Sequence, residues 1–439
     1  MQPDLERRLT ELRAQGVDSV RIMYSDIHGI ARGKDVPLDD FPHAASDGLG
    51  FCSANLADGL SHSLAQLGDR IAGGPVDPAF PDMRIMPIAS TLGVLPWDPA
   101  TAWCIAHVDP DDPRSAAAPR NVLERTLAQF QSLGVTAVCA AEYEFYLLRR
   151  NADGLSRYTN QFSMIYTVGE RSDPQGLVRE MVRSGRQAGL EVTAVHHECG
   201  RGQFEINLNH GEALAAADRA FRFKYMVKEL AARRGLFATF MGKPFADDAG
   251  SGLHVHVSAG DGKSNAFYDA ATPDTLSSTA KHFLAGVLAH APALTAFGSP
   301  TINSYKRIVP GTLVPTLANW GYDDRNTYVR VPPDRGKATR LELRAADAAA
   351  NAYLVIAANL AAGLDGIHRK LAPPAPDDPG CVLPARLEDA IAALKADTVL
   401  GSALGRPLVD AFCALKLAEA DQFRRAVTDW ELNEYAWHL

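Results

Sequence analysis

The N-terminal part of the chain shows short helical and strand-like patterns of apolar residues. Residues 4–15 place apolar positions at helical spacing among charged ones, which predicts an amphipathic helix. Val20–Tyr24 and Ala31–Val36 alternate apolar and polar positions on either side of a glycine-containing turn, which predicts a hairpin. A proline-rich stretch at 74–99 precedes one more strand at Ala102–Val108. Together these elements predict a small α+β unit.

Longer elements follow an acidic, proline-containing segment at 109–113. An apolar strand is predicted at Val135–Leu148. Helices are predicted where apolar residues recur every three to four positions, at about 120–133, 175–188, 213–234, 277–290, from about 348, 387–396 and 408–427. Because 439 residues exceed what one hydrophobic core usually organises, we predict two domains, 1–110 and 111–439.

Composition excludes several classes of protein. The chain is 46% hydrophobic and 22% charged, as in ordinary globular proteins, and its formal net charge of -8 has the wrong sign for a nucleic-acid binder. It contains no apolar run long enough for a membrane span, and its charged first segment lacks a signal-peptide core. Six scattered cysteines without a CxxC pair favour buried free thiols. We therefore expect a cytoplasmic protein with neither nucleic acid nor membrane as partner.

Charged residues interrupt the strand at 135–148, where a core strand would be apolar. Glu142 and Glu144 are two residues apart, so the alternation of a strand places both carboxylates on one face. The same alternation of charged and apolar positions recurs in three further segments, at 196–208, 253–258 and 340–344. Four such strands predict a sheet whose concave side is a charged chamber.

A chamber of this kind requires cations. Like charges at contact distance raise one another's pKa until some groups protonate. Oxygen-rich donor sets suit Mg²⁺ or Mn²⁺, and one imidazole is compatible with Mn²⁺. Guanidinium groups that can hold carboxylate and phosphate oxygens occur at Arg307, Arg325, Arg330, Arg340 and Arg344. Metal ions and arginines around anionic substrates are typical of a phosphoryl-transfer site.

Six motifs, in order and approximate spacing, resemble the glutamine synthetase family. They are EYEF (142–145), HHECGRGQFE (196–205), KPFADDAGSGLHVHVS (243–258), NSYKRIVPG (303–311), DRNTYVR (324–330) and RLELR (340–344). The resemblance extends from the N-terminal hairpin to TDWELNEY (428–435). It implies an α+β fold, with a small β-grasp-like N-terminal domain and a catalytic domain whose curved antiparallel sheet is flanked by helices. It also implies a homododecamer of paired hexameric rings with sites between subunits.

The resemblance also implies roles for particular residues, with ATP and two or three Mg²⁺ (or Mn²⁺) as cofactors. The first metal would be held by Glu144, Glu198 and Glu205, and the second by Glu142, His254 and Glu342. ATP would contact His256, Ser258, Arg330 and Arg340. Glutamate would contact Glu144, Gly250, Arg307 and Arg344, and catalysis would use Arg325, Arg344 and Arg307. Six other motif residues are interpreted without a direct role: His196 and His197 as structural, Cys199 as a small packed residue in the turn, and Tyr143, Phe145 and Tyr146 as core or chamber wall.

The sequence departs from ammonia-using members at the amine end. Leu313 stands two residues after Pro-Gly, where those members carry a glutamate that binds and deprotonates ammonium. Ala249 replaces the asparagine of the family's Asn-Gly-Ser-Gly flap, and only Asp47-Gly48 remains of the N-terminal ammonium loop. An apolar wall at Leu313 suits the alkyl part of an organic amine.

These departures predict a ligase that joins the γ-carboxylate of L-glutamate to an organic amine through a γ-glutamyl phosphate. The products would be a γ-glutamylamide, ADP and phosphate, and the reaction would belong to amine and nitrogen metabolism. The amine could be a monoamine, ethanolamine or a polyamine. The base that would deprotonate the amine is not evident from the sequence. Asp47 of a neighbouring subunit and a metal-bound carboxylate are the candidates. Two alternatives stay open: a true glutamine synthetase using ammonium, and a non-catalytic ring protein.

Overall fold

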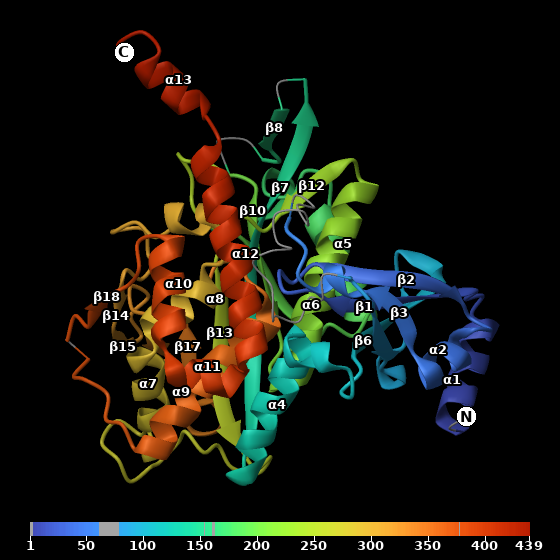
Figure 1. The fold of residues 1–439 in the computed structure, drawn as a ribbon, viewed down its shortest axis with the longest axis horizontal. Coiled ribbons are helices and arrows are strands. Elements are labelled where there is room, and N and C mark those ends of the chain that lie inside the picture. The colour runs from blue at the N-terminus through green and yellow to red at the C-terminus, as the bar shows by residue number, and fades with distance from the viewer. Residues whose placement is uncertain (1–2, 61–78, 153, 160–162, 377) are drawn as a thin grey trace.

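A computed structural model describes residues 3–60, 79–152, 154–159, 163–376 and 378–439. Its N-terminal part packs helices against a small sheet (Figure 1). The strands follow the order β2-β1-β6-β4-β3, with β5 on β6, and β1 runs parallel to β6. The bounds are α1 Pro3–Ala14, β1 Ser19–Ser25, β2 Ala31–Pro37, α2 Phe41–Asp47, β3 Leu49–Cys52, β4 Asp82–Pro87, β5 Gly93–Leu95 and β6 Asp98–Val108.

A larger sheet forms the centre of the rest of the molecule. Among the described residues its main path runs β15-β16-β17-β13-β7-β10-β9, and β8, β11 and β12 also pair with β7. All pairs are antiparallel except β15 with β16. The bounds are β7 Thr136–Asn151, β8 Gly154–Arg157, β9 Val192–His197, β10 Gln203–Leu208, β11 Gly211–Glu212, β12 Leu236–Thr239, β13 Leu253–Gly260, β15 Trp320–Tyr322, β16 Val329–Val331 and β17 Leu341–Leu343. A separate two-stranded sheet pairs β14 Leu317–Ala318 with β18 Cys381–Val382.

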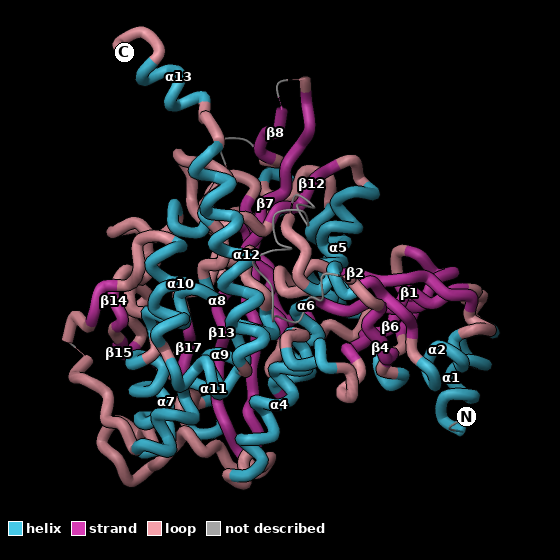
Figure 2. The backbone as a smooth tube through the Cα atoms, viewed as in Figure 1, coloured by secondary structure: helices cyan, strands magenta, loops and turns pink. Residues whose placement is uncertain are grey.

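Helices surround this larger sheet, as the tube view shows (Figure 2). Their bounds are α4 Pro119–Ser132, α5 Leu177–Gln187, α6 Ala213–Arg233, α7 Ser278–Ala289, α8 Ala291–Gly298, α9 Ala352–Arg369, α10 Leu387–Ala396, α11 Thr398–Leu404, α12 Arg406–Arg425 and α13 Asp429–Tyr435. The apolar helix α9 is buried along nearly its whole length. Glycine permits its close approach to α7, because a Cβ at Gly286 would lie 2.2 Å from the carbonyl oxygen of Ala362.

These observations confirm the expected α+β class, with its curved antiparallel sheet and flanking helices. The helix expected from about 348 begins only at Ala352, because the Asn351 side chain accepts a hydrogen bond from the backbone N–H of Tyr353 and caps it. Strands β4 and β5 within the proline-rich stretch were not predicted from the sequence, and its residues 74–78 lie outside the described part. The domain boundary at 110/111 falls between β6 and α4 and stays a prediction.

The cysteine prediction is partly wrong. All six cysteines are free, and Cys104, Cys139 and Cys413 are buried as expected. Cys199 and Cys381 are exposed, because one lies in the turn between β9 and β10 and the other in the short strand β18. Cys199 is therefore not a packed turn residue. Among the described residues no single helix is long and apolar enough to cross a membrane, although the bent pair Thr398–Leu404 and Arg406–Tyr435 passes a test of length and composition.

Candidate active site

Strand β7 carries the centre of the site. Its residue Glu144 lies opposite Glu205 of β10, and Glu142 lies opposite His254 of β13. On the other side of β13, His256 lies opposite Glu342 of β17. Antiparallel pairing therefore brings together the charged faces that the sequence places on four separate segments, as predicted.

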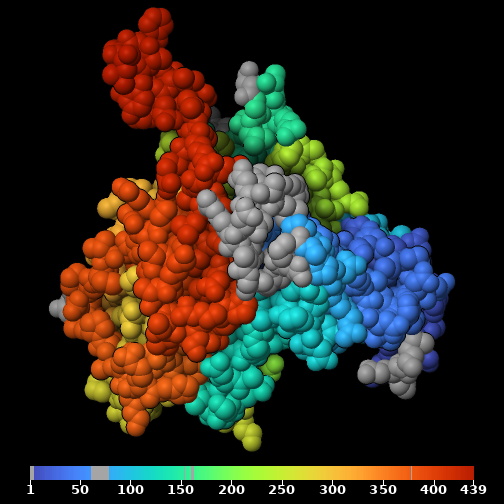
Figure 3. Space-filling view, viewed as in Figure 1, coloured from blue at the N-terminus to red at the C-terminus, as the bar shows by residue number. Residues whose placement is uncertain are grey.

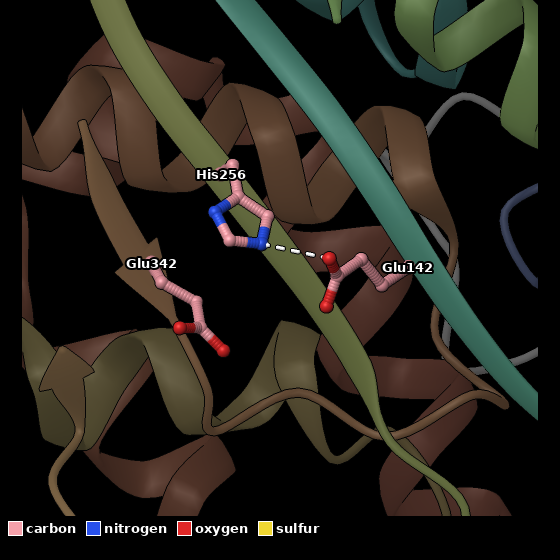
Figure 4. Close-up of side chains that lie close together, drawn as sticks. All are labelled: Glu142, His256 and Glu342. Carbon is pink, nitrogen blue, oxygen red and sulfur yellow. Dashed lines mark ion pairs between the residues drawn. The ribbon is translucent and has the colours of Figure 1, made fainter. Parts of the chain in front are cut away.

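One group that could hold a cation consists of Glu142, His256 and Glu342, from three adjacent strands (Figure 4). The Nε2 atom of His256 lies 3.1 Å from a carboxylate oxygen of Glu142. One ligand atom from each of the three residues lies within 4.8 Å of the other two. The structure thus places His256, which the sequence resemblance predicts to contact ATP, beside two predicted metal ligands.

A second group joins Glu142 to Glu205 and His254. The Nδ1 atom of His254 lies 3.7 Å from Glu142, and its Nε2 atom lies 3.9 Å from Glu144. The side chain of Asn207 donates a hydrogen bond of 2.9 Å to Glu205. His254 therefore faces both β7 carboxylates.

A third group consists of His196, Glu198 and Glu205. The Nε2 atom of His196 lies 2.7 Å from Glu198 and 3.8 Å from Glu205. The ring of Tyr166 lies 5.0 Å from that of His196. His196, interpreted as structural from the sequence, could thus bind a cation. His197 is buried, and its Nδ1 lies 2.7 Å from the backbone oxygen of Glu198.

The electrostatics of the three groups fit divalent cations. Burial, followed by the charges of Glu142, Glu144 and Glu198, raises the pKa of Glu205 to about 9. Burial also disfavours the charged form of Glu142, but hydrogen bonds with His254 and His256 lower its pKa overall. Carboxylate oxygens with imidazole nitrogens form a donor set for Mg²⁺ or Mn²⁺. A cation would relieve the repulsion that otherwise keeps a proton on Glu205.

Arginines adjoin the cation groups on the β17 side. Arg330 and Arg344 each donate a hydrogen bond to Glu342, at 2.5 Å for Arg330. Burial opposes ionisation of Glu342, but the histidines and Arg344 lower its pKa overall. Arg340 donates to Nδ1 of His256 at 3.2 Å and to Asp334 at 2.9 Å.

A cavity of about 370 Å³ opens next to Arg340. Its walls include Glu142, His256, Ser258 and Arg340. Three of the four residues predicted to contact ATP therefore line one cavity, and the fourth, Arg330, binds Glu342 on the adjoining strand. Its lining combines the carboxylate of Glu142, the imidazole of His256 and the guanidinium of Arg340, groups that suit a nucleoside triphosphate bound with cations.

The predicted glutamate side contains a buried guanidinium. Arg307 is 4% exposed, and its Nε has no hydrogen-bond partner among the described residues. Burial lowers the pKa of Arg307, while Glu144 and Asp347 oppose that shift. A Cβ at Gly252 would lie 2.8 Å from Nη2 of Arg307, so a side chain there would displace this guanidinium. An unpartnered buried donor of this kind suits an anionic ligand.

Gln203 was not assigned a role from the sequence, although it lies in a quoted motif. Its Nε2 donates 3.0 Å hydrogen bonds to Glu144 and to the backbone oxygen of Gly250. The backbone N–H of Gly252 also donates to Glu144, at 2.8 Å. The signal that could have identified Gln203 is its position two residues before Glu205, on the same strand face.

Three predicted residues lie in exposed positions. The Arg325 side chain is exposed, and its backbone oxygen accepts a hydrogen bond of 3.1 Å from Arg344. Leu313 is 53% exposed, with a left-handed φ of 57°, in the connection from Arg307 to β14. Asp47 ends α2 and accepts a hydrogen bond from Ser46. Among the described residues, no hydrogen bond or ion pair joins Leu313 or Asp47 to the carboxylate groups. By contrast Tyr143, Phe145 and Tyr146 are fully buried, as expected.

Fold and site together define a class: a curved sheet that presents carboxylates, imidazoles and guanidiniums to cations and anionic substrates. Residues 116–435 match the family model described as glutamine synthetase, catalytic domain. A glutamine synthetase from Halobacterium salinarum is 34% identical over 97% of this chain and 95% of its own length. A glutamate–methylamine ligase from Methyloversatilis universalis is 35% identical, with 97% of each chain covered. The chain belongs to the glutamine synthetase family.

A solved structure described as a GmaS/ADP complex supports the same conclusion for the fold. It is 33% identical, covers 98% of this chain and 99% of its own, and has a TM-score of 0.87. The protein is therefore an ATP-dependent ligase of this family, whose members use ATP and divalent metals. The family sequence motifs were sufficient to identify it.

Proposed function

We propose that the protein joins the γ-carboxylate of L-glutamate to an organic amine, with ATP cleaved to ADP and phosphate. The observation that carries the proposal is leucine at 313, where ammonia-using members have a glutamate. Leucine can neither bind a cation nor accept a proton. Sequence identity alone does not decide between amine and ammonium, because the glutamine synthetase and the glutamate–methylamine ligase differ by only one percentage point, at 34% and 35%.

The chain's own side chains would hold the substrates in this reaction. Arg307 and Arg344 would pair with the glutamate carboxylates, and Gly250 would meet its amino end. The γ-carboxylate attacks the terminal phosphorus of ATP, the bond to ADP breaks, and a γ-glutamyl phosphate forms. Arg325 would stabilise the charge on the transferred phosphoryl group, and Arg330 and Arg340 would hold the ATP phosphates beside His256 and Ser258.

Divalent cations would be held by Glu142, Glu144, Glu198, Glu205, His254 and Glu342, and would neutralise phosphate and carboxylate charge when bound. His196 and His256 are close enough to join these donor sets. Of the six predicted ligands, all except Glu144 occur in the three groups described above.

The second step needs a neutral amine, which attacks the acyl carbon and releases phosphate. Alkylamines are mostly protonated near neutral pH, so a group must accept a proton. Leu313 would line the site for the alkyl group, and each buried methylene would contribute about 0.8 kcal/mol. A neutral neighbourhood around Leu313, with Thr312, Val314 and Pro315, favours a monoamine over a polyamine, whose distal charge would need an acidic partner.

Assembly and location belong to the same proposal. We propose two domains divided at 110/111 and a cytoplasmic homododecamer of paired hexameric rings, in which a site is completed across a subunit boundary. Asp47, exposed at the end of α2, would be available for such a boundary. Light scattering with activity measured on each separated species tests this; a fully active monomer would contradict it.

The test of the reaction is phosphate release from ATP with glutamate and one acceptor at a time: ammonium, methylamine, ethylamine, ethanolamine, putrescine or spermine. We expect a primary monoamine to give the highest kcat/KM. Highest kcat/KM with ammonium would instead make the protein a glutamine synthetase. No glutamate-dependent phosphate release with any acceptor would indicate the non-catalytic alternative.

A further inference from the structure

The loop between β12 and β13 presents Gly250 to the site, yet its own residues there offer few side-chain contacts. Ala249 carries only a methyl group, so its side chain makes no hydrogen bond. Gly250 cannot carry a side chain, because a Cβ would lie 2.6 Å from the backbone oxygen of Gly242 and 2.7 Å from Cγ of Arg307. The position of this segment must therefore be set by the residues around it.

Two arginines from different hairpins bind the two aspartates that precede Ala249. Arg157, at the end of β8, donates from Nε to Asp248 at 2.9 Å and from Nη2 to Asp247 at 2.5 Å. Arg201, in the turn between β9 and β10, donates from Nε to Asp248 at 3.2 Å and from Nη2 to Asp247 at 3.1 Å. The backbone N–H of Arg201 adds a third bond to the same oxygen of Asp248, at 3.2 Å.

The two aspartates differ in burial. The side chain of Asp248 is 10% exposed, whereas that of Asp247 is 67% exposed. Ion pairs in solvent are screened and contribute little, whereas charge-assisted hydrogen bonds shielded from water are strong. Asp248 is also bound from within the loop, since Ala249 donates its N–H to Asp248 Oδ1 at 3.1 Å and Lys243 donates to the Asp248 backbone oxygen at 2.5 Å. The Asp248 carboxylate therefore anchors this segment to its neighbours.

The contacts continue from Asp248 to the site. Tyr146 donates its hydroxyl to the backbone oxygen of Ala249 at 2.7 Å. Gln203 holds the backbone oxygen of Gly250 and Glu144 at the same time, at 3.0 Å each. Arg201 lies three residues after Glu198 in the β9–β10 turn, so the clamp also ties this segment to a predicted cation ligand.

We propose that Asp248, held by Arg157 and Arg201, is a positioning residue that places Gly250 for the amino end of glutamate. The proposal rests on glutamate being the substrate, as in the proposed function, but not on which amine is used. Loss of the Asp248 carboxylate should release the loop at one end while Gln203 and Tyr146 still hold the other. Glutamate affinity should therefore fall more than nucleotide affinity.

The test measures binding of L-glutamate to the full-length protein by calorimetry, with Mg²⁺ and a non-hydrolysable ATP analogue and without amine. In Asp248→Asn we expect the glutamate Kd to rise about tenfold, while the Kd of the ATP analogue stays within about twofold. Asp247→Asn is the matched control, with both constants within about twofold because that carboxylate is solvated. Arg201→Lys keeps the charge but loses the forked contact, and we expect an intermediate rise in the glutamate Kd.

Equal glutamate affinity in wild type and Asp248→Asn would overturn the positioning role. So would a parallel loss of glutamate and nucleotide affinity with a lowered melting temperature, which is the result of a purely structural role. If Asp248→Asn does not fold, Arg201→Lys decides by the same criteria. No glutamate binding by the wild type would overturn the proposed function, and with it this proposal, so the two failures are distinguishable.

Discussion

The cation end of the site and its amine end are built from different kinds of structure. Glu142, Glu144 and Glu342 lie inside hydrogen-bonded strands of one sheet, and their mutual positions follow from strand register. At the other end, Leu313 of the proposed amine site lies in a connection between elements, as do Arg307 and Gly250, which would meet glutamate. Leu313 even adopts a left-handed backbone that most residues avoid.

The difference explains how one family can change substrate and keep its chemistry. A shift of one residue in the register of β7, β10 or β17 would turn the carboxylates of that strand away from the chamber, so these strands tolerate little change. Connections accept substitutions more easily, provided that neighbours hold them in place. The space-filling view shows C-terminal segments, in red, beside segments from the first third of the chain, in cyan (Figure 3). Substrate choice is therefore expected to reside in the connections.

The largest effect should come from breaking the cation end. Glu342→Ala and Glu144→Ala should each lower kcat/KM by about 10²- to 10³-fold, because each removes a proposed cation ligand. Glu342→Ala also removes the acceptor of hydrogen bonds from Arg330 and Arg344. Glutamate-dependent phosphate release measures the loss, and circular dichroism confirms folding. Glu434→Ala, in the terminal helix α13, is the control and should be unchanged. Turnover above a few per cent in either site variant would contradict the strand-borne cation site.

At the amine end, Leu313→Glu should change preference rather than abolish turnover. Two methylene-sized groups of ethylamine are worth about 1.6 kcal/mol against an apolar wall, so the ethylamine-to-ammonium ratio of kcat/KM should fall by roughly 15-fold. Leu313→Met, which keeps the apolar surface, should leave the ratio near the wild-type value. If the wild type prefers ammonium and Leu313→Glu does not change the ratio, the proposal that Leu313 lines the amine site is wrong.

Cation binding should depend on pH through Glu205. The pKa of Glu205 is about 9 in the folded protein, above its ordinary value of 4.5. Between these two pH values and without metal, the folded state therefore keeps a proton on Glu205 that the unfolded state has released. Metal-free stability should therefore fall as pH rises from about 5 to 9. Mg²⁺ displaces this proton, so its stabilising effect on the melting temperature should grow over the same range. The same slope in Glu205→Gln would show that another group titrates.

A change outside both ends should affect stability alone. His290 is placed between Asp397 and Asp365, at 2.5 and 3.1 Å; burial lowers its pKa, but these two carboxylates raise it overall. Its stabilising contribution should be complete below pH 6.5 and disappear as pH rises through the raised pKa. His290→Asn should lose about 1–3 kcal/mol of unfolding free energy at pH 6 and less at pH 9. Changed substrate preference in this variant would mean that the helices also shape the amine end.

Sequence patterns anticipated much of the fold and the chemistry of its centre. Alternation correctly placed Glu142 with Glu144, and the histidines of β13 together, because the side-chain period of a strand is a local property. Exposure of Cys199 and the role of Gln203 were missed. Exposure depends on which segments cover a turn, and Gln203 acquires its partners only when β7 and the β12–β13 loop lie beside it.

The sequence by itself determined which side chains share a strand face, the ordered motifs of the family and the substitution at Leu313. Only the tertiary structure decided that Glu142 meets both His254 and His256, and that Arg157 and Arg201 meet at Asp248. The physical reason is sequence separation. Contacts within a strand follow from backbone geometry, whereas contacts between segments about 50 to 100 residues apart depend on the register and packing of the whole sheet.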